Sequence, residues 1–553
     1  MRLIKAKALQ YEQRISFEEF YNDFPKYAIL SHTWDATQEV TFQDCNYVSS
    51  TSKTGYSKIR RTCELALAGG IEYVWVDTCC IDKSSSAELT EAINSMFRWY
   101  QQAKVCYVHL ADKTETSQLK NCRWFSRGWT LQELIAPKSM MFFDCSWTCI
   151  GSKGSLMNHI SSITSIDVDI LSHKAPISSA CIAKRFSWAA GRKTTRVEDI
   201  AYCLLGLCDI NMPMLYGEGQ VAFRRLQEEI IKSTYDLSIL AWRPPNETSE
   251  EFLGFLAESV HDFASCSEMY FDTNSLFDEG EMSVSNKGLK IKTPEIFLES
   301  LEMGYRYALL LNCKHRGVSK SFLTVPMRKI GPYTFVRARS LRTQNVDHKT
   351  GKPLFDLDPV IPGERRHIST TLLTKLPNPA IQTALTPGRS SRIISSSRYT
   401  VIQIEFPPEI PQKRTQLTPG KCWDEEDCAF FGCHSFSQNW AAISLDGLAL
   451  FVCFWGQKEN RWSFRGTLLK GNSEGVDQFK DELFLFAEEL NYRQPIIRSL
   501  LRDIQDEDES SVRIVAGGRV FRIHFTVKRA DDPNLCSGPG WKVAFKREFL
   551  NYI

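Results

Sequence analysis

Between Tyr27 and Trp147 the sequence alternates between short apolar runs and amphipathic segments, and this alternation limits the folds open to the chain. The apolar runs typical of buried strands cover 27–30, 71–76, 105–110 and 140–144. The segments with helical spacing between them cover 57–68, 86–103 and 124–134. Helices of this length between strands favour parallel pairing, because the chain must cross back over the sheet. The sequence therefore predicts a doubly wound, mostly parallel α/β sheet.

Polar residues gather where the first two predicted strands end. Ser31, His32, Thr33 and Trp34 follow the first apolar run directly, and the segment 77–82 follows the second. In an open parallel sheet, ligands bind in the crevice outside the carboxyl ends of the strands. We therefore expect a ligand site in which Ser31, His32, Asp77 and Asp82 lie at one edge of the sheet.

The remaining sequence divides into regions of different character. We expect an α/β domain over 1–150 that begins with a short lead-in, a helical extension packed on it over 151–242, and a β-rich region over 243–553 with long loops around 341–420. Within the extension, Thr195 and Glu198 have the spacing of a capping box. The Gly-x-Gly that starts at Gly217 has no strand before it and no third glycine, which indicates a turn and helix cap rather than a phosphate loop.

Charge and apolar patterning exclude several classes of protein. The chain has 553 residues, with 67 basic and 65 acidic residues and a net charge of +2. No field of one sign is therefore present to attract nucleic acid or an anionic membrane. No apolar run approaches the roughly 20 residues that span a bilayer. The first residues lack the apolar core of a signal peptide, so we expect a cytoplasmic protein.

The cysteines are numerous but do not form a recognisable framework. Many of the 18 lie inside apolar segments, where a free thiol behaves as a small hydrophobe. In a reducing compartment we expect them to stay unpaired. Cys422, Cys428, Cys433 and His434 have spacings unlike those of common zinc modules, so no metal site is predicted.

The carboxylates near the second strand end each have two interpretations. Glu88 and Glu91 fall in the first turns of the predicted helix 86–103, close enough to the strand ends to act on a ligand. Ser85 and Glu88 also fit the Ser-x-x-Glu pattern, in which the glutamate only caps the helix. Similarly, Asp82 fits a turn residue, and Asp77 fits an anchor that accepts backbone N–H bonds.

The other polar candidates are equally open. His32 is a general base, a ligand contact or a structural histidine. Cys79 and Cys80 suggest a cysteine nucleophile, although no oriented third group can be identified. Arg127 and Trp129 lie in an aromatic-rich segment that either stacks on a planar ligand or fills the core, and Glu133 shares this ambiguity.

Three blocks of the sequence resemble the signature blocks of the fungal heterokaryon incompatibility (HET) domain family. These blocks are Tyr27–Trp34, Val74–Asp82 and Arg127–Leu134. They occur in the family's order, and the resemblance covers roughly residues 25–150. The helical stretch that follows is similar to an extension that often accompanies this domain. Unlike many relatives, the chain has no Walker A pattern and no repeats.

The resemblance implies a role in non-self recognition in filamentous fungi, in which such domains trigger growth arrest or death of fused cells. HET domains are distantly similar to Toll/interleukin-receptor (TIR) domains, a flavodoxin-like α/β fold, and some of these cleave NAD⁺ with a glutamate after a central strand. By position that catalytic glutamate would be Glu88, with Glu91 second. The residues around the NAD⁺ substrate would be Ser31, His32, Trp34, Asp77, Asp82, Arg127 and Trp129. No cofactor is required.

A second function from a different class is a HET domain without enzymatic activity. Such a module would self-associate and recruit a death-inducing protein partner. TIR-like domains do both, so the resemblance leaves the choice between NAD⁺ cleavage and assembly open.

Overall fold

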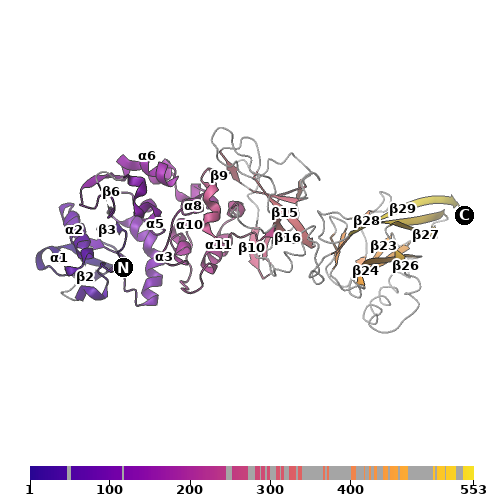
Figure 1. Cartoon of the computed structure of the whole chain (residues 1–553), viewed down its shortest axis with the longest axis horizontal. Helices are drawn as coiled ribbons and strands as arrows, with labels where there is room; N and C mark the ends of the chain where they lie inside the picture. The colour runs from indigo at the N-terminus through magenta and orange to yellow at the C-terminus, as the bar shows by residue number, and fades with distance from the viewer. Residues whose placement is uncertain are drawn as a thin grey trace.

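A computed structural model describes residues 1–243 except 36, 47–50 and 115–117, then residues 252–271, and beyond these mainly the strands of the C-terminal part. Figure 1 shows the N-terminal sheet at one end of the molecule, the helical segment beside it and the later strands beyond.

The N-terminal sheet contains seven strands in the order β2-β1-β4-β3-β5-β6-β7. Their bounds are β1 Arg2–Lys5, β2 Phe17–Glu19, β3 Tyr27–His32, β4 Tyr73–Trp75, β5 Val105–His109, β6 Met140–Phe143 and β7 Cys149–Ser152. The four central strands β4, β3, β5 and β6 pair in parallel, whereas β1, β2 and β7 pair antiparallel. The predicted α/β fold with parallel core strands is confirmed, and the sheet as a whole is mixed.

The antiparallel edges are the main difference from the sequence expectation. Residues 1–26 are more than a lead-in, because β1 pairs with β4 through Ile4 and Val74, and β2 pairs with β1. These strands are only four and three residues long, too short to show an alternating pattern. On the other side, β7 returns from β6 through a turn in which Asp144 Oδ1 accepts the N–H groups of Ser146 and Thr148.

Helices cover both faces of the parallel core. Helix α2 (Thr54–Ala68) joins β3 to β4, and α3 (Ser86–Gln102) joins β4 to β5. Successive side chains of a strand point to opposite faces, and β3 shows this directly. Ser31 bonds Glu133 on one face, while His32 lies 3.4 Å from the ammonium of Lys58 on the other. The predicted stop of α2 is also correct, since Gly69 caps it and Gly70 has φ of 70°.

The helix predicted over 124–134 is broken in two. The structure has α4 (Arg123–Ser126) and α5 (Thr130–Ile135), and the backbone between them is extended at Arg127. In that link the Gly128 N–H donates to the Lys193 carbonyl at 2.8 Å. A Cβ on Gly128 would stand 2.5 Å from Cγ2 of Thr194. The backbone here pairs with the helical segment instead of continuing the helix.

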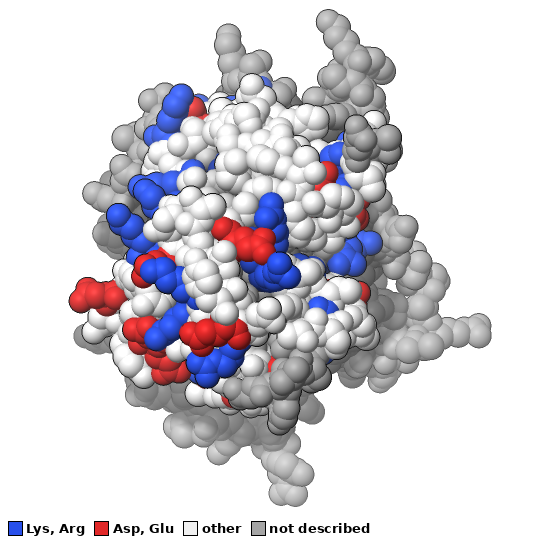
Figure 2. Space-filling model, turned by 90° about the vertical axis from the view of Figure 1, so that its left-hand side faces the viewer, with Lys and Arg blue, Asp and Glu red and all other residues white. Residues whose placement is uncertain are grey.

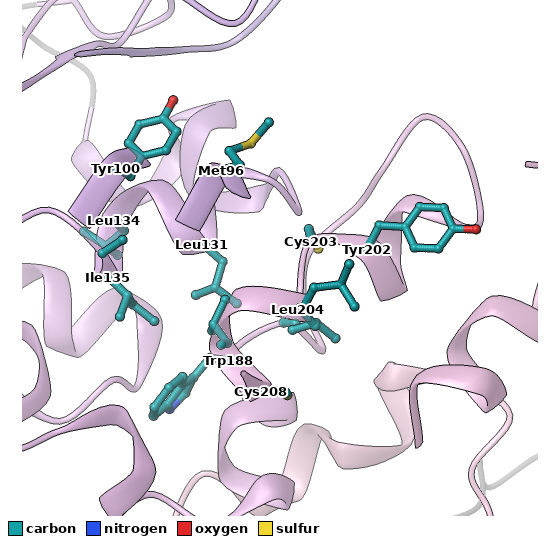
Figure 3. Close-up of a cluster of buried hydrophobic side chains, with 14 of the residues drawn as sticks. Met96, Tyr100, Leu131, Leu134, Ile135, Trp188, Tyr202, Cys203, Leu204 and Cys208 are labelled. Carbon is teal, nitrogen blue, oxygen red and sulfur yellow. The ribbon is translucent and has the colours of Figure 1, made fainter. Parts of the chain in front are cut away.

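The helical segment that follows begins and ends with a longer helix, α6 (Lys153–Thr164) and α11 (Val221–Ser233), and has short helices between them. The short helices are α7 Val168–Leu171, α8 Ile182–Ser187, α9 Asp199–Tyr202 and α10 Leu205–Cys208, with single 3₁₀ turns η4 Ile177–Ser179 and η5 Leu237–Leu240. Figure 3 shows how this segment packs on the α/β part: side chains from α3 and α5, among them Met96, Tyr100 and Leu134, form one apolar cluster with Trp188 and Leu204.

The predicted capping box in this segment is wrong, whereas the predicted turn is confirmed. Glu198 Oε1 accepts the backbone N–H groups of Gly217 and Gly219, at 2.8 and 3.0 Å, instead of capping its own helix. Both glycines have positive φ, 104° and 60°, as a tight turn requires. The N–H groups that an anion would use are therefore already bonded to a carboxylate of the chain.

The described strands after residue 251 form further sheets. The first has strands β8 Phe252–Leu253, β10 Glu281–Ser285, β11 Gly288–Lys292, β12 Glu295–Leu298, β13 Tyr307–Leu310, β15 Thr324–Gly331, β16 Thr334–Ala338, β17 Arg365–His367 and β18 Thr370–Leu372. A small pair, β9 Met269–Phe271 with β14 Cys313–His315, lies beside the 3₁₀ helix η6 Val260–Cys266.

Two more sheets lie toward the C-terminus. One has β19 Thr400–Glu405, β21 Trp423–Asp424, β22 Ala429–Gly432, β27 Glu507–Ala516, β28 Arg519–Ala530 and β29 Gly540–Tyr552; the other has β20 Gln416–Leu417, β23 Trp440–Leu445, β24 Ala449–Lys458, β25 Arg461–Lys470 and β26 Arg502–Ile504. Cys422, Cys428, Cys433 and His434 lie outside the described residues, as does most of 341–420.

Packing continues from the helical segment into the first of these sheets. Gln227 of α11 is fully buried and bonds both the N–H and the carbonyl of Ala257. Arg337 of β16 donates to the carbonyls of Leu240 and Trp242 and lies over the Trp242 ring, 4.0 Å from its centroid. The apolar core is accordingly continuous from Leu3 to Phe335.

The cysteines whose side chains the structure describes are free thiols, most of them buried. Within the same part of the chain, no helix is both long enough and apolar enough to cross a membrane.

The close contact between α10 and α3 depends on a glycine. A Cβ on Gly206 would stand 2.1 Å from Cβ of Phe97, so Gly206→Ala must push the two helices apart. Overpacking of this kind costs about 1–3 kcal/mol of unfolding free energy, measured by chemical denaturation. Gly191→Ala is the control, because nothing lies within 4 Å of that Cβ, and it should change stability by less than about 0.5 kcal/mol. Equal effects of the two substitutions would contradict this account of the packing.

Candidate functional site

The carboxyl ends of β3 and β4 meet at one edge of the sheet. Ile29 is opposite Trp75 in the parallel register, so Ser31 and Asp77, each two residues further on, lie at the same end. The chain leaves β3 for β4 on one side and later enters β5 on the other, so strand order reverses beside β3. Such a reversal opens a crevice at the strand ends where ligands bind in open α/β sheets.

A chain of buried polar groups runs through this edge. His32 Nε2 lies 3.1 Å from Asp77 Oδ1, and His32 Nδ1 lies 3.4 Å from Lys58 Nζ and 3.7 Å from Glu39 Oε1. Lys58 in turn donates to Glu39 and to the Thr33 carbonyl at 3.2 Å. All four ionisable side chains are almost completely removed from solvent.

Both ring nitrogens of His32 have neighbours inside the protein. Nε2 lies within hydrogen-bond distance of Asp77, and Nδ1 lies near Lys58 and Glu39. With a side-chain exposure of 1%, His32 is enclosed among these groups and links Asp77 to Lys58. This geometry favours the structural role among the three interpretations that the sequence left open.

Asp77 holds two side chains in place. Its Oδ2 accepts the indole N–H of Trp34 at 3.0 Å, while Oδ1 accepts from His32. Burial by itself would raise the pKa of Asp77, but the His32 hydrogen bond and the charges of Lys83 and Arg127 hold it below its ordinary value. Asp77 is therefore an ionised, buried carboxylate, and it orients the Trp34 ring.

Two cations lie against that ring. The Lys83 ammonium is 3.7 Å from the Trp34 ring centroid, and the Arg127 guanidinium carbon is 4.6 Å from it. A third cation, Arg123, donates to the Trp34 carbonyl at 2.8 Å. The Lys83 side chain is exposed overall. Its ammonium group nevertheless lies against other atoms of the protein, and this partial desolvation lowers the pKa of Lys83. We call Trp34, Lys83, Arg123 and Arg127 the tryptophan–cation surface; its chemistry suits an anionic group.

On the other face of β3, Glu133 forms a buried group with Ser31. The Ser31 hydroxyl donates to Glu133, and the indole N–H of Trp124 donates to that hydroxyl at 2.8 Å. Burial, followed by the negative charge of Asp77, raises the pKa of Glu133 to about 8. The carboxyl group is therefore largely protonated at neutral pH.

Glu88 and Asp82 belong to a separate cluster. Glu88 Oε1 accepts from the Arg2 guanidinium at 2.9 Å and from the Asp82 N–H at 2.8 Å. The Ser85 hydroxyl caps α3 by accepting the Glu88 N–H, as the sequence suggested, but the Glu88 carboxylate does not return the bond to Ser85. Asp82 Oδ1 accepts from Gln43 at 2.7 Å. No described hydrogen bond connects this cluster to His32 or Asp77.

Two further candidates from the sequence are Trp129 and Cys79. Trp129 is half-buried against the apolar core, and its side chain lies beside the Asp199 carboxyl group. Cys79 is fully buried, and burial raises its pKa well above the usual range, so it is not a thiolate. Among the described residues, no group of three His, Cys, Asp or Glu side chains could hold a metal ion.

The sequence reasoning missed Glu39, Lys58 and Lys83. A usable signal existed for Lys58, which shares the buried face of α2 with Thr62 and Ala66 at helical spacing. A lysine on an apolar helical face is rarely buried without a partner. Glu39 and Lys83 lie in loops, where no periodicity marks a buried side chain or a ring contact.

The ion pair between Lys58 and Glu39 can be tested by a double-mutant cycle. Lys58→Met leaves the Glu39 carboxylate buried without its cation, which should cost about 3–5 kcal/mol of unfolding free energy. Adding Glu39→Gln removes that charge, so the double variant should regain more than half of the loss. Additive effects of the two substitutions in denaturant titrations would contradict the proposed pairing.

Glu133 should give the stability of the protein a pH dependence of definite sign. Between its ordinary pKa of 4.5 and its folded value of about 8, the folded chain keeps a proton that the unfolded chain has lost. Unfolding free energy should therefore fall as pH rises through this window, by up to about 1.4 kcal/mol per pH unit. Glu133→Gln, which mimics the protonated form, should flatten the profile between pH 5 and 8. An unchanged slope would show that Glu133 does not hold the proton.

Comparison with known proteins gives two family matches. Residues 27–121 match the family described as heterokaryon incompatibility protein (HET), which confirms the resemblance, and the first two sequence blocks lie within these residues. Residues 221–345 match a domain of unknown function (DUF8212).

The comparisons also give one curated relative. Over 221 residues the chain is 46% identical to vegetative incompatibility protein HET-E-1 of Podospora anserina. The aligned part is 38% of this chain and 16% of that protein, so the chain spans well under two thirds of its relative. No solved structure matches the chain at a significant level.

Proposed function

Since residues 27–121 carry a HET domain, we propose that this chain is a vegetative incompatibility protein that triggers growth arrest or cell death after non-self recognition. The name of its relative, a vegetative incompatibility protein, supports the assignment. We further propose that it acts in the cytoplasm of a filamentous fungus, and that a protein partner supplies the trigger.

The observation that carries the proposal is the meeting of three distant sequence blocks at one sheet edge. His32 and Trp34 come from the first block, Asp77 from the second and Arg127 from the third, and they are in mutual contact through hydrogen bonds and the Trp34 ring. The buried side chains of His32 and Asp77 fix the orientation of the Trp34 ring. The tryptophan–cation surface carries the charges that a ligand would contact. We propose that this surface binds the molecule on which signalling depends.

The enzymatic form of the proposal is cleavage of NAD⁺ by a TIR-like site. The parallel strand order β4-β3-β5-β6 is that of flavodoxin-like sheets, which is compatible with a TIR-like fold. Lys83 and Arg127 would hold the pyrophosphate, and a carboxylate would stabilise the oxocarbenium-like transition state. Glu88 is the positional candidate for that carboxylate, but its bonds to Arg2 and Asp82 favour a structural role.

The non-enzymatic form is an interaction module that self-associates and recruits a death-inducing partner. One observation favours it: Asp77 and Glu39 are bonded internally, and Glu133 faces Ser31 in the core. A carboxylate free to act on a ribose is therefore not among these three. The cations of the tryptophan–cation surface would then contact an acidic surface of the partner.

The site assignment is tested by removing two cations of this surface. Lys83→Ala with Arg127→Ala should leave the fold intact, because neither side chain takes part in a described ion pair, yet reduce cell death on expression in a fungal host by tenfold or more. Loss of charged hydrogen bonds of about 1.5–3 kcal/mol each underlies that expectation. The control is Arg61→Ala with Lys120→Ala, which removes the same charge from exposed positions. Full killing by the first variant would refute the assignment.

Measuring NAD⁺ in the same cells separates the two forms of the proposal. If Glu88 is catalytic, Glu88→Gln should abolish both NAD⁺ loss and death while the protein stays folded. If it is structural, the variant should lose about 0.5–2 kcal/mol of stability and still kill. Glu91→Gln, one turn further along α3, is the control. Death without any NAD⁺ loss in the unmodified protein would leave the assembly module as the correct form.

A further inference from the structure

A second site lies between the α/β part and the helical segment. A crevice of about 710 Å³ opens between α3, the segment that follows α7, and α10. Small-molecule sites typically have volumes of roughly 300–1,000 Å³. The crevice shares no lining residue with the edge that holds Asp77 and Trp34.

A buried arginine reaches this crevice. Arg185 of α8 is 8% exposed, and its guanidinium donates through Nε to the Ala180 carbonyl and through Nη1 to the Leu207 carbonyl, at 2.7 and 3.2 Å. Nη2 has no partner among the described residues and is not among the buried unpartnered atoms, so it faces accessible space. The side chain is thus fixed by backbone carbonyls with one pair of N–H groups left for a ligand.

The charge of Arg185 is not neutralised by an ion pair among the described residues. Asp236 lies close enough for an electrostatic interaction with Arg185. Its carboxylate oxygens, however, accept the backbone N–H groups of Ile182 and Ser238, at 2.7 and 3.0 Å. A nearly buried cation without a carboxylate partner is costly unless an anion or solvent compensates it. This points to an anion as the occupant of the crevice.

The rest of the lining agrees in charge. Arg98 of α3 and Lys174 are exposed cations on the walls, and neither forms a described ion pair. Among the described lining residues, Asp209 is the acidic one. His173 contributes no charge at neutral pH, because burial, followed by the charge of nearby Lys153, lowers its pKa. The crevice therefore has an excess of two positive charges.

We propose that this crevice binds a phosphate-bearing small molecule of nucleotide size. Guanidinium groups bind phosphate oxygens through paired N–H donors, and an ammonium adds a point charge. Phe97, which lines the same wall, offers a half-buried aromatic ring to an organic moiety. Volume, charge and the apolar wall together favour an organic phosphate over a bare inorganic anion. The site is independent of the function proposed above.

The test measures binding of ATP, pyrophosphate and adenosine to the full chain by calorimetry and by thermal shift. ATP should bind and raise the melting temperature, with pyrophosphate weaker and adenosine weakest. Arg98→Ala with Lys174→Ala should weaken ATP binding by tenfold or more without unfolding the protein, because both side chains are exposed. The charge-matched control Arg61→Ala with Lys120→Ala should stay within twofold of the unmodified protein.

Two results would overturn the proposal. One is the absence of any ATP or pyrophosphate binding by the unmodified protein. The other is equal weakening by the crevice variant and its control, which would show attraction by general charge alone. The double variant Lys83→Ala with Arg127→Ala distinguishes the two sites. If ATP affinity falls in this variant and not in the crevice variant, the phosphate binds at the tryptophan–cation surface and the crevice assignment is wrong.

Discussion

The N-terminal site depends on two buried carboxylates, Asp77 and Glu39, which lie on either side of His32. Asp77 and Glu39 would repel each other in an apolar interior, and the Lys58 ammonium and the His32 imidazole between them make their burial tolerable. Buried ion pairs seldom add net stability compared with apolar packing, because their desolvation is costly. Their value here is geometric: they fix the direction of the Trp34 indole through Asp77. The proposed binding face is therefore positioned by buried groups that lie behind it.

This arrangement also separates positioning from contact at the sheet edge. His32 and Asp77 come from the polar clusters that the sequence marks, yet both are occupied with internal bonds. The side chains exposed beside them are cations, and Figure 2 shows that at this end of the molecule basic and acidic side chains are interspersed rather than gathered into one field. The binding that we propose at this edge would depend on a few fixed charges and a fixed ring, not on long-range attraction.

The central sheet and the meeting of the strand ends at the candidate site could be predicted from the sequence because their causes are local. Apolar runs such as 71–76 and the Gly69-Gly70 stop are visible in the chain itself, and parallel pairing brings Ser31 and Asp77 together whatever the side chains do. The break at Gly128 could not be predicted, because its cause is a carbonyl of Lys193, sixty-five residues later in the chain. The partner of Glu88 was hidden for the same reason: Arg2 lies in a strand of four residues that shows no pattern. Long-range polar contacts are what a single sequence conceals.

Arg337 has a consequence for where the chain can be divided. Its guanidinium group donates hydrogen bonds to the carbonyls of Leu240 and Trp242, where the helical segment ends. Arg337 itself lies in a strand, 95 residues after Trp242. Gln227 makes a similar link to Ala257. A fragment that stops just after Trp242 would leave a fully buried amide, two carbonyls and a tryptophan face without their partners. The shortest fragment that keeps these contacts extends through β16. The family match over 221–345 also spans the contact between the helical segment and this sheet.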